Sequence, residues 1–148
     1  MTAPSIGAYT TAQRTTNGTT LAISVPSFST GDTLYVAYVD DADAGSASID
    51  GTGWTAVVSD YTVPASGVPD SGSFYLWKKA AGGTTYTVTS TVSERAVMVA
   101  FIVQNDGGFN VTVVNANGST SSPSVAALTT TVADCLRISI VAASADRT

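Results

Sequence analysis

Short stretches in which apolar and polar residues alternate recur along the chain. In residues 21–25 every second side chain is apolar, and Pro26 ends the stretch. Residues 84–92 alternate most clearly, because Tyr86 and Val88 lie between threonines. A two-residue period places successive side chains on opposite faces of a β-strand. No window repeats every 3.6 residues, so the pattern predicts an all-β protein.

Two stretches are apolar on both faces. Residues 33–39 and 96–103 carry apolar side chains at nearly every position, which is typical of a central strand covered on both sides. Further short strands are expected at 54–58, 74–77, 109–114, 125–131 and 135–141. Nine or ten short strands separated by turn residues predict one antiparallel, jelly-roll-like β-sandwich over residues 1–148. The core is expected to contain Leu34, Val36, Trp54, Leu76, Tyr86, Val88, Val99, Phe101, Leu136 and Ile138.

An internal echo links two of these strands. The pattern of residues 32–39 recurs at 134–141, where Leu136 stands for Leu34 and Ile138 for Val36. The first copy runs on to Trp54, whereas the counterpart in the second copy would lie beyond Thr148. We therefore expect either that the natural protein continues past Thr148 or that a neighbouring subunit supplies the closing strand.

The composition excludes several kinds of partner. Only 11% of the residues are charged, 44% are hydrophobic and the net charge is −5. The chain contains 23 Thr and 18 Ser, which give a sheet a neutral hydroxyl coat. Its six basic residues form no stripe, so neither nucleic acid nor an anionic membrane is an expected partner.

Little catalytic chemistry is available to this sequence. The chain has no His and one Cys, which excludes His-dependent triads and the common zinc sites. Cys135 lies in an apolar alternating stretch and is expected to be a buried hydrophobe. The acidic residues of 40–45 lack the spacing of an EF-hand and indicate a solvated loop. We expect no enzyme activity, no metal and no cofactor.

Residues 1–7 lack the features of a secretory signal, and no apolar run approaches a membrane span. The composition nevertheless resembles that of extracellular β proteins. A virus particle reconciles the two, because it assembles in the cytoplasm and is released by lysis. The virion is therefore the expected location.

Two surface features suggest binding. The loop of residues 61–69 is apolar and restricted by proline, and its candidate assembly contacts are Tyr61, Val63, Pro64, Val68 and Pro69. The alternative is a loop that folds over its own sandwich. The aromatic residues Trp54, Trp77, Tyr61 and Tyr75 could instead form a platform for sugar stacking, although strand positions favour the core for both tryptophans.

Several segments in order resemble a β-sandwich module of phage genomes and prophage-type reading frames. They are Val25-Pro26, Gly31-Asp32-Thr33-Leu34, Gly53-Trp54-Thr55, Tyr75–Ala80, Tyr86–Thr89 and Pro123–Ile140. The resemblance covers about residues 20–148 and implies a structural role in a virion. The expected function is a capsid decoration (cement) protein or the particle-bound domain of a head or tail fibre. Its partners would be other virion proteins or further copies of the chain. The alternative is a carbohydrate-binding adhesin module of a tail fibre.

Overall fold

The computed structural model describes residues 2–41, 45–63, 72–108, 129 and 135–140. It is an all-β fold in which every paired strand is antiparallel. The strands are β1 (Ser5–Ser24), β2 (Thr33–Asp40), β3 (Ala47–Ile49), β4 (Thr55–Val63), β5 (Gly72–Ala80) and β6 (Thr85–Gln104). In the described part of the chain, no helix is long and apolar enough to cross a membrane.

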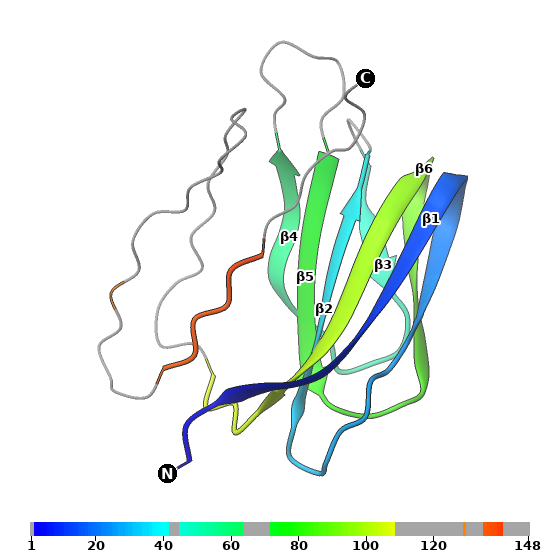
Figure 1. The fold of residues 1–148 in the computed structure, drawn as a ribbon. Helices are drawn as coiled ribbons and strands as arrows, with labels where there is room; N and C mark the ends of the chain where they lie inside the picture. The colour runs from blue at the N-terminus through cyan, green and yellow to red at the C-terminus, as the bar shows by residue number, and fades with distance from the viewer. Residues whose placement is uncertain (1, 42–44, 64–71, 109–128, 130–134, 141–148) are drawn as a thin grey trace.

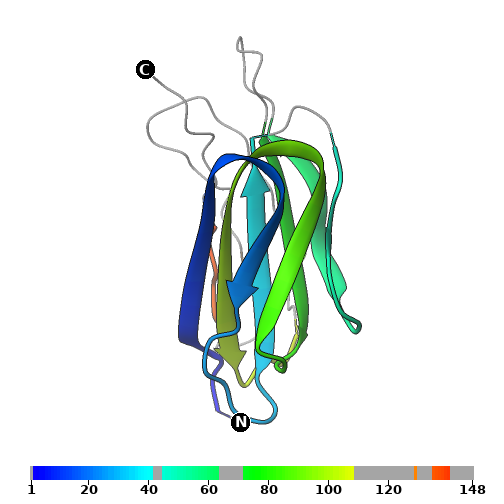
Figure 2. The same ribbon diagram turned by 90° about the vertical axis from the view of Figure 1, so that its right-hand side faces the viewer.

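The strands form one sheet that folds over into two layers (Figures 1 and 2). The sheet order is β1-β6-β2-β5-β4, and β3 pairs with β6. The first layer contains β2, β4, β5 and the pairing of residues 5–14 of β1 with 96–104 of β6. The second layer contains β3 and the pairing of residues 18–24 of β1 with 85–94 of β6. The fold is therefore sandwich-like.

The two long strands, β1 and β6, pass together from one layer to the other. Figure 2 shows both of them arching over at the top of the molecule. The regular register of β1 is interrupted between Arg14 and Gly18, where the pair bends. At the bend Arg14 Nε donates a hydrogen bond of 2.7 Å to the carbonyl oxygen of Glu94. An irregularity of this kind increases local twist and lets a strand change direction without ending.

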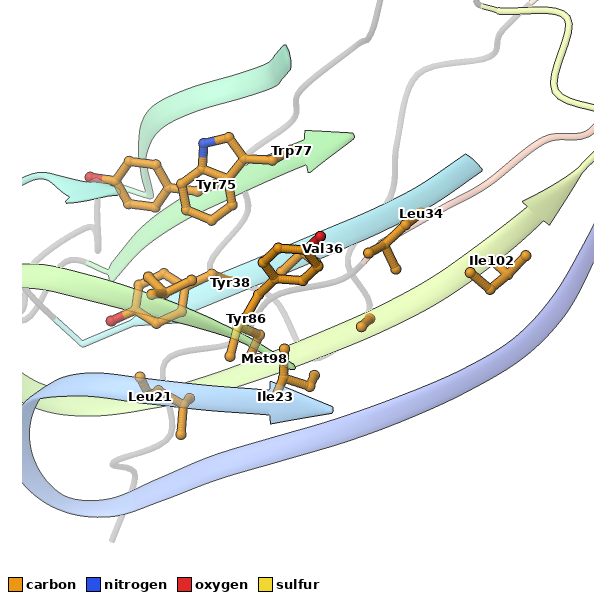
Figure 3. Close-up of a cluster of buried hydrophobic side chains, with 13 residues drawn as sticks. Leu21, Ile23, Leu34, Val36, Tyr38, Tyr75, Trp77, Tyr86, Met98 and Ile102 are labelled. Atoms are coloured by element: carbon orange, nitrogen blue, oxygen red, sulfur yellow. The ribbon is translucent and has the colours of Figure 1, made fainter. Parts of the chain in front are cut away.

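The core lies between the layers (Figure 3). Leu21 and Ile23 from the second layer contribute to the same cluster as Met98 and Ile102 from the first. On β5 the rings of Tyr75 and Trp77 are stacked, with centroids 5.3 Å apart. The side chains that face into this core come from alternate positions of each strand, as the two-residue period predicts.

The expected all-β antiparallel fold is confirmed, but the division into nine or ten short strands does not match the six described strands. The two stretches expected at 84–92 and 96–103 are one strand, β6, because β1 bends with it and keeps it paired. The first sixteen residues of β1 were not expected as a strand at all. Of the strand expected at 135–141, the described residues 135–140 are not part of a strand, while 109–114 and most of 125–131 lie outside the described residues.

The predicted core is largely confirmed. Six of the ten expected residues are buried, namely Leu34, Val36, Leu76, Tyr86, Val88 and Phe101. Three more, Trp54, Val99 and Leu136, are partly buried and pack against the buried clusters. Ile138 was predicted wrongly, because 40% of its surface is exposed.

The turn between β5 and β6 depends on one glycine. Gly83 has a φ of +77°, and a Cβ added there would lie 2.7 Å from the hydroxyl oxygen of Tyr86. That hydroxyl donates to the carbonyl of Gly82 at 3.1 Å and accepts from Lys79 Nζ at 3.0 Å. An alanine at position 83 would combine an unfavourable backbone conformation with displacement of a buried ring.

We expect Gly83→Ala to lower the free energy of unfolding by about 1–3 kcal/mol, measured by urea denaturation. Gly82→Ala is the matched control, because a Cβ at that position meets nothing within 4 Å. Its effect should stay within about 0.5 kcal/mol of zero. Equal losses in the two variants would show that the turn tolerates a side chain at neither position and that Gly83 has no special role.

Candidate assembly surface

The first layer of the sheet has a second apolar face, on the side away from the core. Its buried members form what we call the outer cluster: Tyr35, Ala37, Val58, Leu76, Phe101 and Val103. They arise because β2 and the second half of β6 are apolar at consecutive positions, so each strand presents apolar side chains to both sides. Tyr35 and Phe101 stack across neighbouring strands, with centroids 5.3 Å apart and planes within 9°.

The outer face becomes more exposed towards β1. Val99 on β6 is partly buried against the outer cluster, whereas Val97, two residues earlier, is 52% exposed. On β1, Tyr9 pairs with Phe101 and is 69% exposed. Directly opposed residues of an antiparallel pair share a face. The apolar outer face therefore reaches solvent along the boundary between β1 and β6.

One corner of the outer face is polar. The Tyr35 hydroxyl donates to an Asp106 carboxylate oxygen at 2.8 Å, and the Lys78 ammonium lies 5.9 Å from the centroid of the Tyr35 ring. Burial, followed by the bond to Asp106, raises the pKa of Tyr35. Burial alone would raise the pKa of Asp106, but hydrogen bonds from the Gly108 N–H and the Tyr35 hydroxyl hold it below its ordinary value. This corner of the outer face therefore contains a neutral tyrosine that is hydrogen-bonded to an ionised aspartate.

The contact residues predicted from the sequence are only partly described. Tyr61 and Val63 belong to strand β4 and not to a loop, because β4 continues past Val58 through an irregularity at Asp60, whose φ is 49°. Tyr61 lies opposite Phe74 and packs against the outer cluster. Pro64, Val68 and Pro69 lie outside the described residues. Their role in assembly stays a prediction.

Sequence reasoning missed the exposed apolar residues at the opposite edge of the sheet, along β1 and the adjoining stretch of β6. Tyr9 and Ile6 are 69% and 46% exposed, and they sit in a segment with too little alternation to predict a strand. Val97 was assigned to a strand expected to be covered on both sides. A long apolar run indicates a central strand. It does not show at which residue the neighbouring layer stops covering that strand.

The four aromatic residues considered for sugar stacking are not gathered on one solvated face. Trp77 and Tyr75 are 7% and 3% exposed and belong to the core. Trp54 packs edge-on against Tyr86, with centroids 5.0 Å apart, and Lys79 lies 5.3 Å from the Trp54 ring centroid. Tyr61 lies on the outer face instead. The arrangement therefore offers no platform built from these four rings.

Two acidic side chains at the end of β2 and just after it form contacts within the fold. Arg95 forms an ion pair with Asp41 at 3.2 Å, and Ser90 donates to buried Asp40 at 3.3 Å. Cys135 is half-buried and forms no disulfide. Within residues 2–41, 45–63, 72–108, 129 and 135–140, no three His, Cys, Asp or Glu side chains are grouped so that they could hold a metal ion. Among the described strands, the exposed large apolar side chains are Ile6 and Tyr9 on β1 and Val97 on β6.

Comparison with protein-family models, with curated proteins and with solved structures finds no match to this chain.

Proposed function

We propose that this protein is a structural component of a bacteriophage particle, as a capsid decoration protein or as the particle-bound domain of a head or tail fibre. The observation that carries the proposal is the exposed apolar margin of the sheet, where Ile6 and Tyr9 on β1 and Val97 on β6 reach solvent beside the buried outer cluster. Exposed apolar surface next to a rigid sheet is a common property of protein–protein interfaces.

The composition supports the same role. A chain with 11% charged residues and a coat of Thr and Ser can pack against neighbouring subunits with few charges to desolvate. The ordered resemblance of residues 20–148 to phage β-sandwich modules adds a biological setting. The described side chains offer a surface for assembly, and the binding of partners requires no catalytic group.

The test is the protein composition of purified particles. Particles banded by density from a lysate of the strain that encodes this chain are digested, and their peptides are quantified by mass spectrometry. We expect peptides of this chain in a fixed ratio to those of the shell or tail proteins, while a soluble host protein is depleted in the same band. A chain that stays in the soluble fraction and is absent from the band would contradict the proposal.

A further inference from the structure

The two edge strands of the first layer differ in how far they are protected against pairing with another chain. The layer ends at β1 on one side and at β4 on the other. Along β4 the register shifts twice, and Asp60 adds a charge and a positive φ at the second shift. Shifts and charges of this kind are what natural proteins use to keep an edge strand from pairing with another chain. The β4 edge is therefore poorly suited to pair with another chain.

Between Tyr9 and Gln13 the β1 edge lacks both shifts and charges, and the register of its first half shifts only between Ile6 and Tyr9. From Tyr9 to Arg14 it pairs with β6 residue for residue, without a shift, and residues 5–13 contain no charge and no proline. None of the residues 5–20 is buried, and β6 is the ladder partner of β1 in the described chain. In Figure 2 the first half of β1 is the outermost strand on the left. Its outer row of backbone N–H and C=O groups is thus suited to accept a further strand.

Exposed apolar side chains gather beside the same edge. Ile6 and Tyr9 on β1 are 46% and 69% exposed, and Val97 on the adjacent stretch of β6 is 52% exposed. Tyr9 pairs with Phe101 and so extends the outer face to the edge. A strand added to β1 would cover backbone groups and part of this apolar surface together. Two independent features, an open ladder and an apolar margin, therefore point to the same place.

We propose that this edge pairs antiparallel with the same edge of a second copy, so that two first layers join into one continuous sheet. A two-fold axis perpendicular to the sheet gives that arrangement, and it places the outer faces of both copies on the same side. An antiparallel edge is self-complementary about a two-fold axis, because the free N–H and C=O groups of one copy meet the C=O and N–H groups of the other, and this favours a second copy as the occupant. Two chains of net charge −5 repel each other over most of their surfaces. Residues 5–13 contain no charged residue, so this segment can pair with its own copy without placing like charges opposite each other.

This inference deepens the assembly role proposed above and rests on that role for its biological setting. The test of the dimer needs only the purified chain. A negative result there would overturn the dimer without bearing on whether the chain is found in particles. Sedimentation equilibrium of the full chain from micromolar to millimolar concentration should show a monomer–dimer equilibrium. A monomer over the whole range would overturn the proposal.

Charge placed on the edge should weaken the dimer. Thr11→Lys and Gln13→Lys each put a lysine at an exposed position of the β1 edge, and the two lysines of a dimer would repel across the axis. We expect the dissociation constant to rise at least about tenfold, with circular dichroism and thermal unfolding showing that both variants fold. Thr89→Lys is the matched control, because Thr89 is an exposed strand position in the second layer.

Dimers that persist in both folded edge variants, or that weaken equally in Thr89→Lys, would overturn the proposal. A cysteine scan of positions 8–12 in a Cys135→Ser background gives a positive test. A two-fold axis brings one position of each strand opposite its own copy, with Cα atoms about 4.5–5.5 Å apart, within reach of a disulfide. Cross-linking confined to one or two adjacent positions supports paired strands, and equal cross-linking at all five contradicts them.

Discussion

Leu34→Ala is expected to lower the free energy of unfolding by about 2–5 kcal/mol, the range for a leucine truncated in a packed core. Leu34 is fully buried and contributes to the cluster between the two layers. It lies on β2, which is paired on both sides, with β5 and with β6. The strand cannot easily move to fill the space left by the side chain, so most of the cavity cost should remain. Urea denaturation with a common m-value provides the measurement.

The internal echo of the sequence supplies the controls. Leu136 has the same place in its segment as Leu34, but it is partly buried against the outer cluster, so Leu136→Ala should cost less than Leu34→Ala. Ile138 is 40% exposed, and Ile138→Ala should change stability by less than about 0.5 kcal/mol. Similar losses in all three variants would mean that residues 135–140 are packed as tightly as β2, contrary to the structure.

Alkaline pH is expected to destabilise the protein steeply above pH 10. Burial and the nearby Asp60 raise the pKa of Tyr75 from 10.0 to about 12, and burial and Asp40 raise that of Tyr38. Tyr35 shifts in the same direction because of burial and Asp106. These hydroxyls hold their protons in the folded state at a pH where the unfolded chain has lost them. Their stabilisation is complete below pH 10 and is lost as the pH rises towards the folded-state values.

The expected slope is about 1.4 kcal/mol per pH unit for each such tyrosine. Urea denaturation between pH 9 and 12 measures it, and tyrosinate absorbance follows the ionisation directly. Tyr75→Phe is the informative variant. It loses the hydroxyl bonded to Asp60 at 3.2 Å and to the carbonyl of Gly45 at 3.4 Å, so it should be less stable at pH 8 and less sensitive to alkali. A slope unchanged by this variant would contradict the assignment to Tyr75.

The local pattern of apolar and polar residues predicted the strands whose side chains are buried. Residues 33–39 are apolar on both sides because β2 separates the core from the outer cluster, and here the sequence carries the whole signal. The first part of β1 could not be found in this way. Its side chains are mostly small or polar, and it is a strand because its backbone pairs with β6, a long-range property that local alternation does not encode.

The echo at Leu136 and Ile138 shows a second limit. The same alternation that builds β2 recurs there, yet the described residues 135–140 are not part of a strand. A two-residue period states that a segment can be a strand, but the available partner decides whether it becomes one. The candidate surface follows the same rule. The apolar sequence around Tyr61 predicts a contact there, and Tyr61 packs against the outer cluster. The β1 edge could not be predicted in this way, because it depends on which strand is outermost in the sheet.

The pairing of β1 with β6 also sets the order in which this fold can form. Ser5 pairs with Gln104 and Ser24 with Thr85, so the first strand synthesised waits for the last of the described strands. At about 5–20 residues per second, a ribosome needs several seconds to make the chain between them. Such distant contacts give slow folding, because the loop must close before the pairing stabilises it. A strand with a single charge that waits unpaired for that time is an aggregation risk, and expression at lower temperature or with a holding chaperone should raise the soluble yield.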